Sequence, residues 1–434
     1  MNYLSKLLAV LILFSGISFS CCAQKQGINI DPKEILRIEN TLAGDAMKGR
    51  KTGTPEIDSA ARFIAMEFSK AGLQPYTASF LQEFIIVHPK LLGVKAEMDD
   101  QEIDPGNVIV VTSNPDLKVN EKAGYKMHYI NPANTPDAAQ MLRRARAFIT
   151  GRENAVVFVD TSFAKNFSRL TNLKKQLFKR AHNVVFVLGN YQPKEFTIKA
   201  EHAFDEMKLK NVVGILPGKT KGNEYVIFSG HYDHIGIGKP ENGDSIYNGA
   251  NDDAAGITAV IMLAKYFKAQ NNNERTLVFA AFTAEETGGF GSQYFSQLMK
   301  SDEIVAMFNI EMIGTESKWG KNSAYITGYD KSDMGTIMQE SLQGTPFTFH
   351  PDPYPDQQLF YRSDNATLAR LGVPAHTIST SKMDSEPNYH KPSDEVKTLD
   401  IENMAAIIKA IALSATSIIN GKATPARVKV ENLR

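Results

Sequence analysis

The chain of 434 residues has little cysteine, one tryptophan and no excess of either charge. Both cysteines, Cys21 and Cys22, stand near the N-terminus, so the remaining chain can form neither a disulfide framework nor a thiolate metal site. Lysine plus arginine and aspartate plus glutamate number 48 each, and no basic stripe stands out. We therefore expect neither a nucleic-acid partner nor an electrostatic membrane partner. Any metal in the folded body must be held by His, Asp or Glu.

We also expect no hydrophobic run that spans a bilayer. Residues 1–23 begin with a short segment that carries Lys6, continue with an apolar run at 7–14 and end in small residues. This pattern is typical of a signal peptide, because the run is shorter than a transmembrane helix. We expect cleavage after Ala23, export to the periplasm or the medium, and no transmembrane span in the mature chain. Residues 18–20 form a poor lipoprotein signal, so a lipid anchor at Cys21 is the less favoured alternative.

Strand-like and helix-like stretches alternate from about residue 210 to the C-terminus. This alternation predicts an α/β fold with a mostly parallel central sheet flanked by helices. A helix is expected at 55–71, with Thr54 as its cap and Gly72 at its end. A final helix is expected to start at Asp400.

Residues 88–205 interrupt this rhythm. They hold four strand-like runs, NVIVVT, KMHYI, AVVFVD and NVVFVLG, with a basic helical stretch, NLKKQLFKRA, between the last two. We read this segment as an inserted, smaller α+β or β-rich domain of ordinary size. The expected division is a signal peptide at 1–23, a first part of the main domain at 24–87, the insertion at 88–205 and the rest of the main domain at 206–434.

Five candidate metal ligands stand in sequence order, after strand-like runs or in polar loops. They are His231 in FSGHYDH, Asp252 in NGANDDAAG, Glu286 in AFTAEETGG, Glu311 in FNIEMIG and His390 in NYHKPSDE. Two imidazoles and three carboxylates suit a pair of zinc ions. Because ligands bind beyond the carboxyl ends of strands in an open α/β sheet, we expect all five to meet at one edge.

Neighbouring polar residues suggest supporting roles. Glu285, next to a candidate ligand, is free to take a proton from a metal-bound water. Asp233 is placed to orient a ligand imidazole, and His234 is the alternative ligand in the same motif. Of the pair Asp252 and Asp253, one can cap the following helix while the other binds metal.

The order HxD, ANDDAAG, EE, NxxM and a late histidine resembles the M28 family of zinc peptidases over roughly residues 35–82 and 210–420. The resemblance implies a zinc-peptidase/phosphorylase-like sandwich, an insertion similar to a protease-associated domain, and two Zn²⁺ per chain, with Co²⁺ or Mn²⁺ as substitutes. It also implies ligand roles. Asp252 bridges the ions, His231 and Glu311 complete one site, and Glu286 and His390 complete the other.

The same resemblance implies an exported aminopeptidase that removes N-terminal residues from peptides with a free N-terminus. A metal-bridging water would attack, with Glu285 as the general base. The family more often has Asp where Glu311 stands, and SDH where residues 363–365 read SDN. Tyr361, in this neighbourhood, is expected to stabilise the oxyanion.

Two alternatives share the scaffold: a glutaminyl-peptide cyclotransferase with one zinc, and a non-catalytic receptor-like ectodomain. The sequence does not indicate the oligomeric state or the preferred N-terminal residue.

Overall fold

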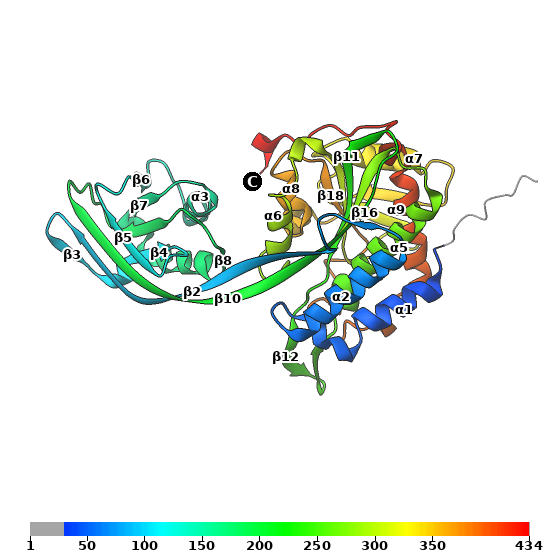
Figure 1. Ribbon diagram of the computed structural model, residues 1–434, viewed down its shortest axis with the longest axis horizontal. Helices are drawn as coiled ribbons and strands as arrows, with labels where there is room; N and C mark the ends of the chain where they lie inside the picture. The colour runs from blue at the N-terminus through cyan, green and yellow to red at the C-terminus, as the bar shows by residue number, and fades with distance from the viewer. Residues whose placement is uncertain (1–29, 434) are drawn as a thin grey trace, which may run out of the picture.

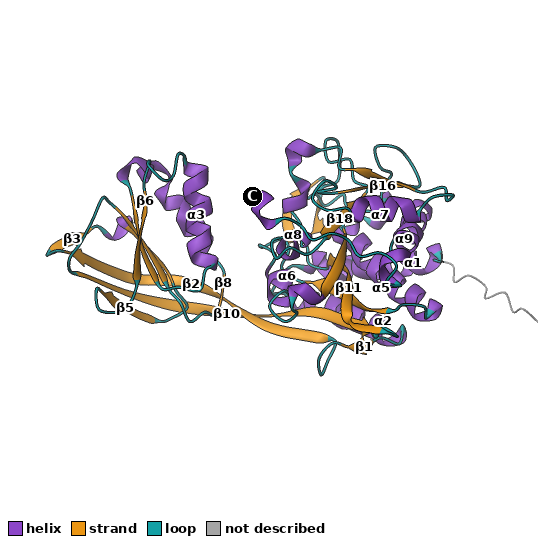
Figure 2. Ribbon diagram, turned by 90° about the horizontal axis from the view of Figure 1, so that it is seen from above, coloured by secondary structure: helices purple, strands orange, loops and turns teal. Residues whose placement is uncertain are grey.

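The computed structural model describes residues 30–433, so the expected signal peptide and Cys21 lie outside the described residues. The chain forms a large α/β body and a smaller domain, which stands apart at the end of two long paired strands (Figure 1). The second view shows the same separation (Figure 2).

The main sheet is mixed, with a parallel centre. In spatial order its strands are β17 (Thr348–Pro351), β16 (Ser323–Ile326), β18 (Ala375–Ser379), β15 (Ile304–Ile310), β11 (Lys221–His231), β14 (Arg275–Phe282), β10 (Phe196–Leu216), β2 (Leu81–Met98) and β3 (Gln101–Ile103). The strands β18, β15, β11 and β14 run parallel. The pairs β16–β18, β14–β10 and β10–β2 are antiparallel. The predicted α/β fold with a parallel central sheet is confirmed, and antiparallel pairs flank the parallel centre.

Helices cover both faces of the sheet. Along β11 the side chains alternate, so that Val226 and Phe228 join one apolar cluster while Ile227 joins another. The first cluster includes helices α1 (Pro32–Leu42), α2 (Pro55–Lys70), α5 (Ala255–Gln270), α7 (Met334–Ser341) and α9 (Ile401–Ser414). The second includes α6 (Phe290–Phe295) and α8 (Asn365–Ala369). Both faces of the central strands are therefore buried, as expected for a parallel sheet.

The helices predicted at the two ends of the main domain are present. α2 ends before Gly72, whose φ of 77° suits glycine. Thr54 does not cap α2, because its hydroxyl donates to the Lys51 carbonyl instead. Asp400 caps α9 by accepting from the Asn403 amide at 3.0 Å. The segment Ile401–Ile419 is apolar and long enough to cross a membrane, but 61% of its most apolar window is buried, as in a core helix.

The inserted domain is carried by a two-stranded ribbon, because β2 and β10 continue from the main sheet into it. The expected boundaries face each other across this ribbon, where His88 pairs with Asp205. Beyond them lies a second sheet in the order β4 (Val108–Val111), β9 (Val184–Leu188), β7 (Ala155–Val159) and β6 (Lys126–Ile130). The strand β5 (Asp116–Asn120) pairs with the outer part of β10.

The helix predicted within NLKKQLFKRA is wrong. A 3-10 helix, Ser168–Lys174, leads into the short strand β8 (Leu177–Phe178), which pairs with Ile86 and Val87 of β2. Leu177 and Phe178 join different apolar clusters on the two sides of β8, which a strand allows and one helical face does not. The domain's main helix is α3 (Ala138–Thr150), which the sequence reading missed.

The smaller elements lie mostly at the edges of these layers. They are β1 (Gln74–Pro75), β12 (Gly236–Glu241), β13 (Asp244–Tyr247), α4 (Ala164–Phe167) and α10 (Thr416–Ile419).

Candidate metal centre

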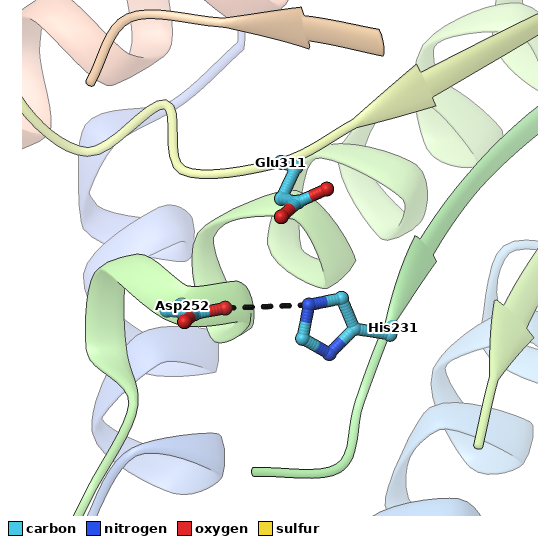
Figure 3. A group of neighbouring side chains, drawn as sticks. All are labelled: His231, Asp252 and Glu311. Atoms are coloured by element: carbon cyan, nitrogen blue, oxygen red, sulfur yellow. Dashed lines mark ion pairs between the residues drawn. The ribbon is translucent and has the colours of Figure 1, made fainter. Parts of the chain in front are cut away.

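The five expected ligands meet at the carboxyl ends of the parallel strands. His231 is the last residue of β11, Glu311 directly follows β15, and Glu286 lies in the turn after β14. Asp252 precedes α5, and His390 lies in the loop after β18. Figure 3 shows His231, Asp252 and Glu311 converging from these three elements. Segments up to 159 residues apart in the chain therefore share one edge of the sheet.

The Asp252 carboxylate lies between two imidazoles. Its Oδ1 is 3.3 Å from His231 Nε2, and its Oδ2 is 3.2 Å from His390 Nε2. His390 Nε2 is also 3.3 Å from Glu286 Oε1. Each oxygen of the Asp252 carboxylate thus faces a different histidine. The peptide bond between Asp252 and Asp253 is cis.

The donor set fits two divalent cations. One group of facing ligand atoms comes from His231, Asp252 and Glu311, and the other from His234, Asp252 and Glu286. Among the described residues Glu311 Oε2 is buried without a hydrogen-bond partner, which leaves it free to bind a cation. Histidine nitrogens and carboxylate oxygens are the ligands that zinc accepts when thiolates are absent.

The pKa values of the groups at the centre are shifted because several carboxyl groups are buried close together. Burial raises the pKa of Glu311 to about 7. Burial would lower the pKa of His390, but Asp252 and Glu286 raise it to about 10. Burial likewise opposes ionisation of Asp252, yet hydrogen bonds from His231 and His390 lower its pKa. The clustered carboxylates favour a positive charge at this site. A divalent cation would supply that charge.

Asp253 holds the ligand segments together rather than facing the ligand cluster. Its Oδ2 accepts from the His231 amide at 3.1 Å. Its Oδ1 accepts from the amides of Gly256 at 3.0 Å and Met312 at 3.1 Å. Gly256 lies in the first turn of α5. Its hydrogen bond to Asp253 is the helix-capping contact that we expected from one residue of the Asp252–Asp253 pair.

Asp233 contacts both the His231 imidazole and the turn that carries the two glutamates. The His231 Nδ1 atom lies 3.1 Å from the Asp233 carbonyl oxygen and 3.9 Å from its carboxylate. The carboxylate instead accepts from the amides of Glu285 at 3.0 Å and Glu286 at 3.3 Å, and from the Thr52 hydroxyl. The backbone of Asp233 therefore orients the imidazole, and its side chain fixes the two glutamates.

Glu285 lies in the same turn as Glu286 and is partly buried. Burial raises the pKa of Glu285 well above its usual value. His231 counters this shift, while the neighbouring carboxyl groups of Glu311 and Asp364 add to it. A carboxylate with a raised pKa holds a proton more readily, as a general base requires near neutral pH.

Arg50 is a supporting residue that the sequence reading missed. Its guanidinium is fully buried and donates to the carbonyls of Tyr232 at 2.8 Å and Gly249 at 2.8 Å. It also donates to the carbonyls of Leu42 and Asn248. These contacts brace the loops that carry the first two ligands. No local pattern marks Arg50, because all four acceptors are backbone atoms.

A cavity of about 400 Å³, part of which is open to solvent, lies beside this edge of the sheet. Its lining combines apolar and polar side chains. It consists of Glu311, Met312, Tyr325, Thr327, Leu359, Arg362, Ser363, Thr377, Ser379, Met383 and Tyr389.

Tyr361 is not among the residues that line this cavity. It packs against Phe360, with the Arg370 guanidinium 5.9 Å above its ring. Tyr389 lines the cavity instead and stacks on His390 with ring centroids 3.9 Å apart. Its place directly before a predicted ligand was the signal that could have singled it out.

Comparison with known proteins gives a consistent family. The sequence profile described as "Peptidase family M28" matches residues 211–415. A "Probable leucine aminopeptidase" of Trichophyton verrucosum is 28% identical over 216 residues, 48% of this chain and 56% of that protein. "Aminopeptidase YwaD" of Bacillus subtilis is 24% identical over 246 residues, 55% of this chain and 50% of that protein. The chain spans about half the length of the curated relatives it matches.

Solved structures share the fold. The aminopeptidase from Aneurinibacillus sp. strain AM-1 aligns with 94% of this chain and 97% of its own, with a TM-score of 0.53 and 17% identity. The zinc aminopeptidase BSAP from Bacillus subtilis also gives a TM-score of 0.53, with 17% identity, over 91% of this chain and 97% of its own. Residues 211–415 therefore match the profile of peptidase family M28, and the chain shares its fold with solved aminopeptidases.

Proposed function

We propose that the protein is a dinuclear zinc aminopeptidase that hydrolyses N-terminal residues from peptides. The observation that carries the proposal is the Asp252 carboxylate, with His231 Nε2 3.3 Å from one oxygen and His390 Nε2 3.2 Å from the other. His231, Asp252 and Glu311 would hold one ion, and Asp252, Glu286 and His390 the other. The aminopeptidase and zinc metalloprotease names of the relatives agree with this assignment.

Zinc bound here would supply a Lewis acid for the scissile carbonyl and lower the pKa of a water molecule. In this scheme Glu285 takes a proton from the attacking water and passes it to the leaving amine. Asp233 holds the Glu285 amide and so aims the carboxylate. Tyr389, from the cavity wall, is better placed than Tyr361 to donate a hydrogen bond to bound substrate.

The cavity supports a substrate whose N-terminal side chain meets both apolar and polar walls. Its apolar walls include Met312, Leu359 and Met383. Several of its polar groups are already paired within the protein. Ser379 donates to the Met312 carbonyl, and Thr377 donates to the Asn365 side chain. Apolar contact with these walls is therefore one source of affinity for the side chain.

Export is part of the proposal and rests on the leader at residues 1–23. The test is cell fractionation followed by mass analysis of the mature N-terminus. A mature chain starting at Gln24 would support simple export. A lipid-modified Cys21 would indicate membrane anchoring, and an uncleaved cytoplasmic chain would contradict export.

The activity is tested by metal analysis and a panel of aminoacyl p-nitroanilides. We expect two zinc ions per chain, turnover of leucyl and methionyl substrates, and none of their N-acetylated forms. Loss of turnover with a chelator should be reversed by zinc. One zinc with ammonia release from N-terminal glutamine peptides would instead identify a cyclotransferase. A protein that binds no metal would rule out both activities.

A further inference from the structure

A third imidazole, that of His234, faces the second group of donors. Its side chain is fully buried, and its Nδ1 lies 2.9 Å from Glu286 Oε1 and 3.9 Å from Asp252 Oδ2. His390 Nε2 lies 3.3 Å and 3.2 Å from the same two oxygen atoms. Two histidines therefore approach one pair of carboxylate oxygens.

These spacings suit donors around a common ion. Ligand atoms about 2.0–2.2 Å from a tetrahedral zinc are separated from one another by roughly 3.3–3.6 Å. The four N···O distances of His234 and His390 run from 2.9 to 3.9 Å and so bracket this value. The first group contains only one imidazole, that of His231.

The His234 ring is held in this orientation by its surroundings. Its backbone amide donates to the Arg50 carbonyl at 3.3 Å. The ring lies against Gly249, where a Cβ atom would approach its Cγ and Cδ2 to 2.6 Å. Only a glycine at residue 249 leaves room for the imidazole. The donor is thus preorganised by packing, which favours ligation over a loosely placed hydrogen bond.

We propose that His234 is a protein ligand of the second ion, together with Asp252, Glu286 and His390. The inference rests on the proposed pair of zinc ions. It makes the two sites unequal, because four protein ligands close a tetrahedral zinc site whereas three leave a position open. The ion held by His231, Asp252 and Glu311 is then the one that meets the substrate.

The cavity provides an independent observation that agrees with this asymmetry. Of the five ligands expected from sequence and His234, only Glu311 lines it. The three-ligand group therefore borders the space that can admit a substrate. None of the residues of the group with two imidazoles lines the cavity, although Tyr389, which stacks on His390, does.

The competing role for His234 is to orient Glu286 through an Nδ1–H hydrogen bond. The variant His234→Asn separates the two roles, because an asparagine amide can replace the Nδ1 donor but not the imidazole as a ligand. His350→Asn is the matched control, since His350 stacks on Trp319 outside the centre.

Zinc affinity is measured by competition with a chromogenic chelator, and coordination by the visible spectrum of Co²⁺-loaded protein. We expect two ions of unequal affinity in the wild type and an intense tetrahedral Co²⁺ band at the first equivalent. In His234→Asn the tight site should weaken more than about 100-fold, beyond the usual cost of losing an orienting residue, and the band should fall. An unchanged spectrum and affinity within about 10-fold would overturn the inference.

A measurement on the wild type keeps the test independent of how the variant folds. X-ray absorption at one zinc equivalent should count two imidazoles, and a count of one would refute ligation by His234. A wild type that binds fewer than two ions would contradict the proposed metal pair itself. That failure is distinct from a two-ion protein in which His234 is not a ligand.

Discussion

At the scale of single residues, the centre depends on buried carboxyl groups whose neighbours decide their roles. Asp252 faces two imidazoles, whereas Asp253 accepts hydrogen bonds from three backbone amides. The pKa of Glu285 is raised by burial and by the neighbouring carboxyl groups of Glu311 and Asp364. Asp252, Asp253 and Glu285 lie close together but are therefore chemically distinct. The difference comes from what each carboxylate touches.

Glu285→Gln should abolish most of the turnover without removing the metals. The amide keeps the size of the side chain but cannot accept the proton, so kcat should fall by about 10²–10⁴-fold. Steady-state kinetics and metal analysis on the same preparation test this. Glu340→Gln, on the exposed face of α7, is the control and should match the wild type. Near-normal kcat in a metal-loaded Glu285→Gln protein would exclude Glu285 as the base.

Glu39→Gln should change how stability depends on pH. Burial raises the pKa of Glu39 from 4.5 to about 8, although Thr258 and Arg50 partly oppose the shift. The folded state keeps a proton that the unfolded state releases above pH 4.5. The stabilisation by this proton is complete below pH 4.5 and is lost as the pH rises through about 8.

Urea unfolding of metal-free protein at several pH values measures this effect. Between pH 5 and 8, the free energy of unfolding of the wild type relative to Glu39→Gln should fall by about 1.4 kcal/mol per pH unit. Using the difference between the two proteins cancels the titration of the other buried acids. Parallel curves would show that Glu39 does not bind the extra proton.

At the scale of elements, the N-terminal segment braces the loops that carry the ligands. Lys48, Gly49 and Arg50 all have positive φ values, of 42°, 67° and 47°. At Gly49 a Cβ atom would meet the Tyr247 carbonyl oxygen at 2.2 Å, so the turn requires glycine there. This turn delivers the Arg50 guanidinium to the carbonyl groups beside His231 and Asp252.

Arg50→Ala should lower the zinc affinity of both sites by about 10–100-fold, because the carbonyls of Tyr232 and Gly249 lose their donor. Millimolar guanidinium should restore part of the affinity by occupying the vacated space. Arg62→Ala, an exposed residue of α2, is the control. Unchanged zinc affinity in Arg50→Ala would mean that the loops hold their shape without it.

At the scale of the whole molecule, two folded units meet through one ribbon and a small aromatic cluster. Phe178 of β8 lies 5.2 Å from Phe290, between ring centroids, and Phe84 of the ribbon lies 4.6 Å from Tyr294. Ala284, directly before Glu285, belongs to the same cluster. The inserted domain therefore contacts the turn that carries the proposed base, although it supplies none of the expected ligands.

Replacing residues 91–202 by Asn-Gly should yield a folded protein that still binds two zinc ions. Lys90 and Ala203 pair across the ribbon, so a two-residue turn can join them. We expect a lower Tm, because β8 and its contact with Phe290 are lost. Phe178→Ala in the full chain should reproduce part of that loss. Failure of the shortened chain to bind metal would show that the insertion is needed to build the centre.

Much of the main domain follows from local pattern. Alternating strand and helix signals predicted the α/β fold, because apolar periodicity reports directly which faces are buried. The five expected ligands could be picked out because each follows a strand-like run or lies in a polar loop, and strand ends of a parallel sheet share an edge. The basic segment near residue 175 misled the sequence reading, since leucines four residues apart imitate a helix while pairing with β2 makes a strand.

The sequence by itself determined the fold class, the donor types and the absence of thiolate ligands in the folded body. Only the tertiary structure decided which group each donor faces. It placed His234 beside Glu286 and gave the Asp233 carboxylate two backbone amides as partners. It also placed Tyr389 on the cavity wall and revealed the buried Arg50. These outcomes depend on contacts between segments far apart in the chain, and such contacts leave no periodic trace in the sequence.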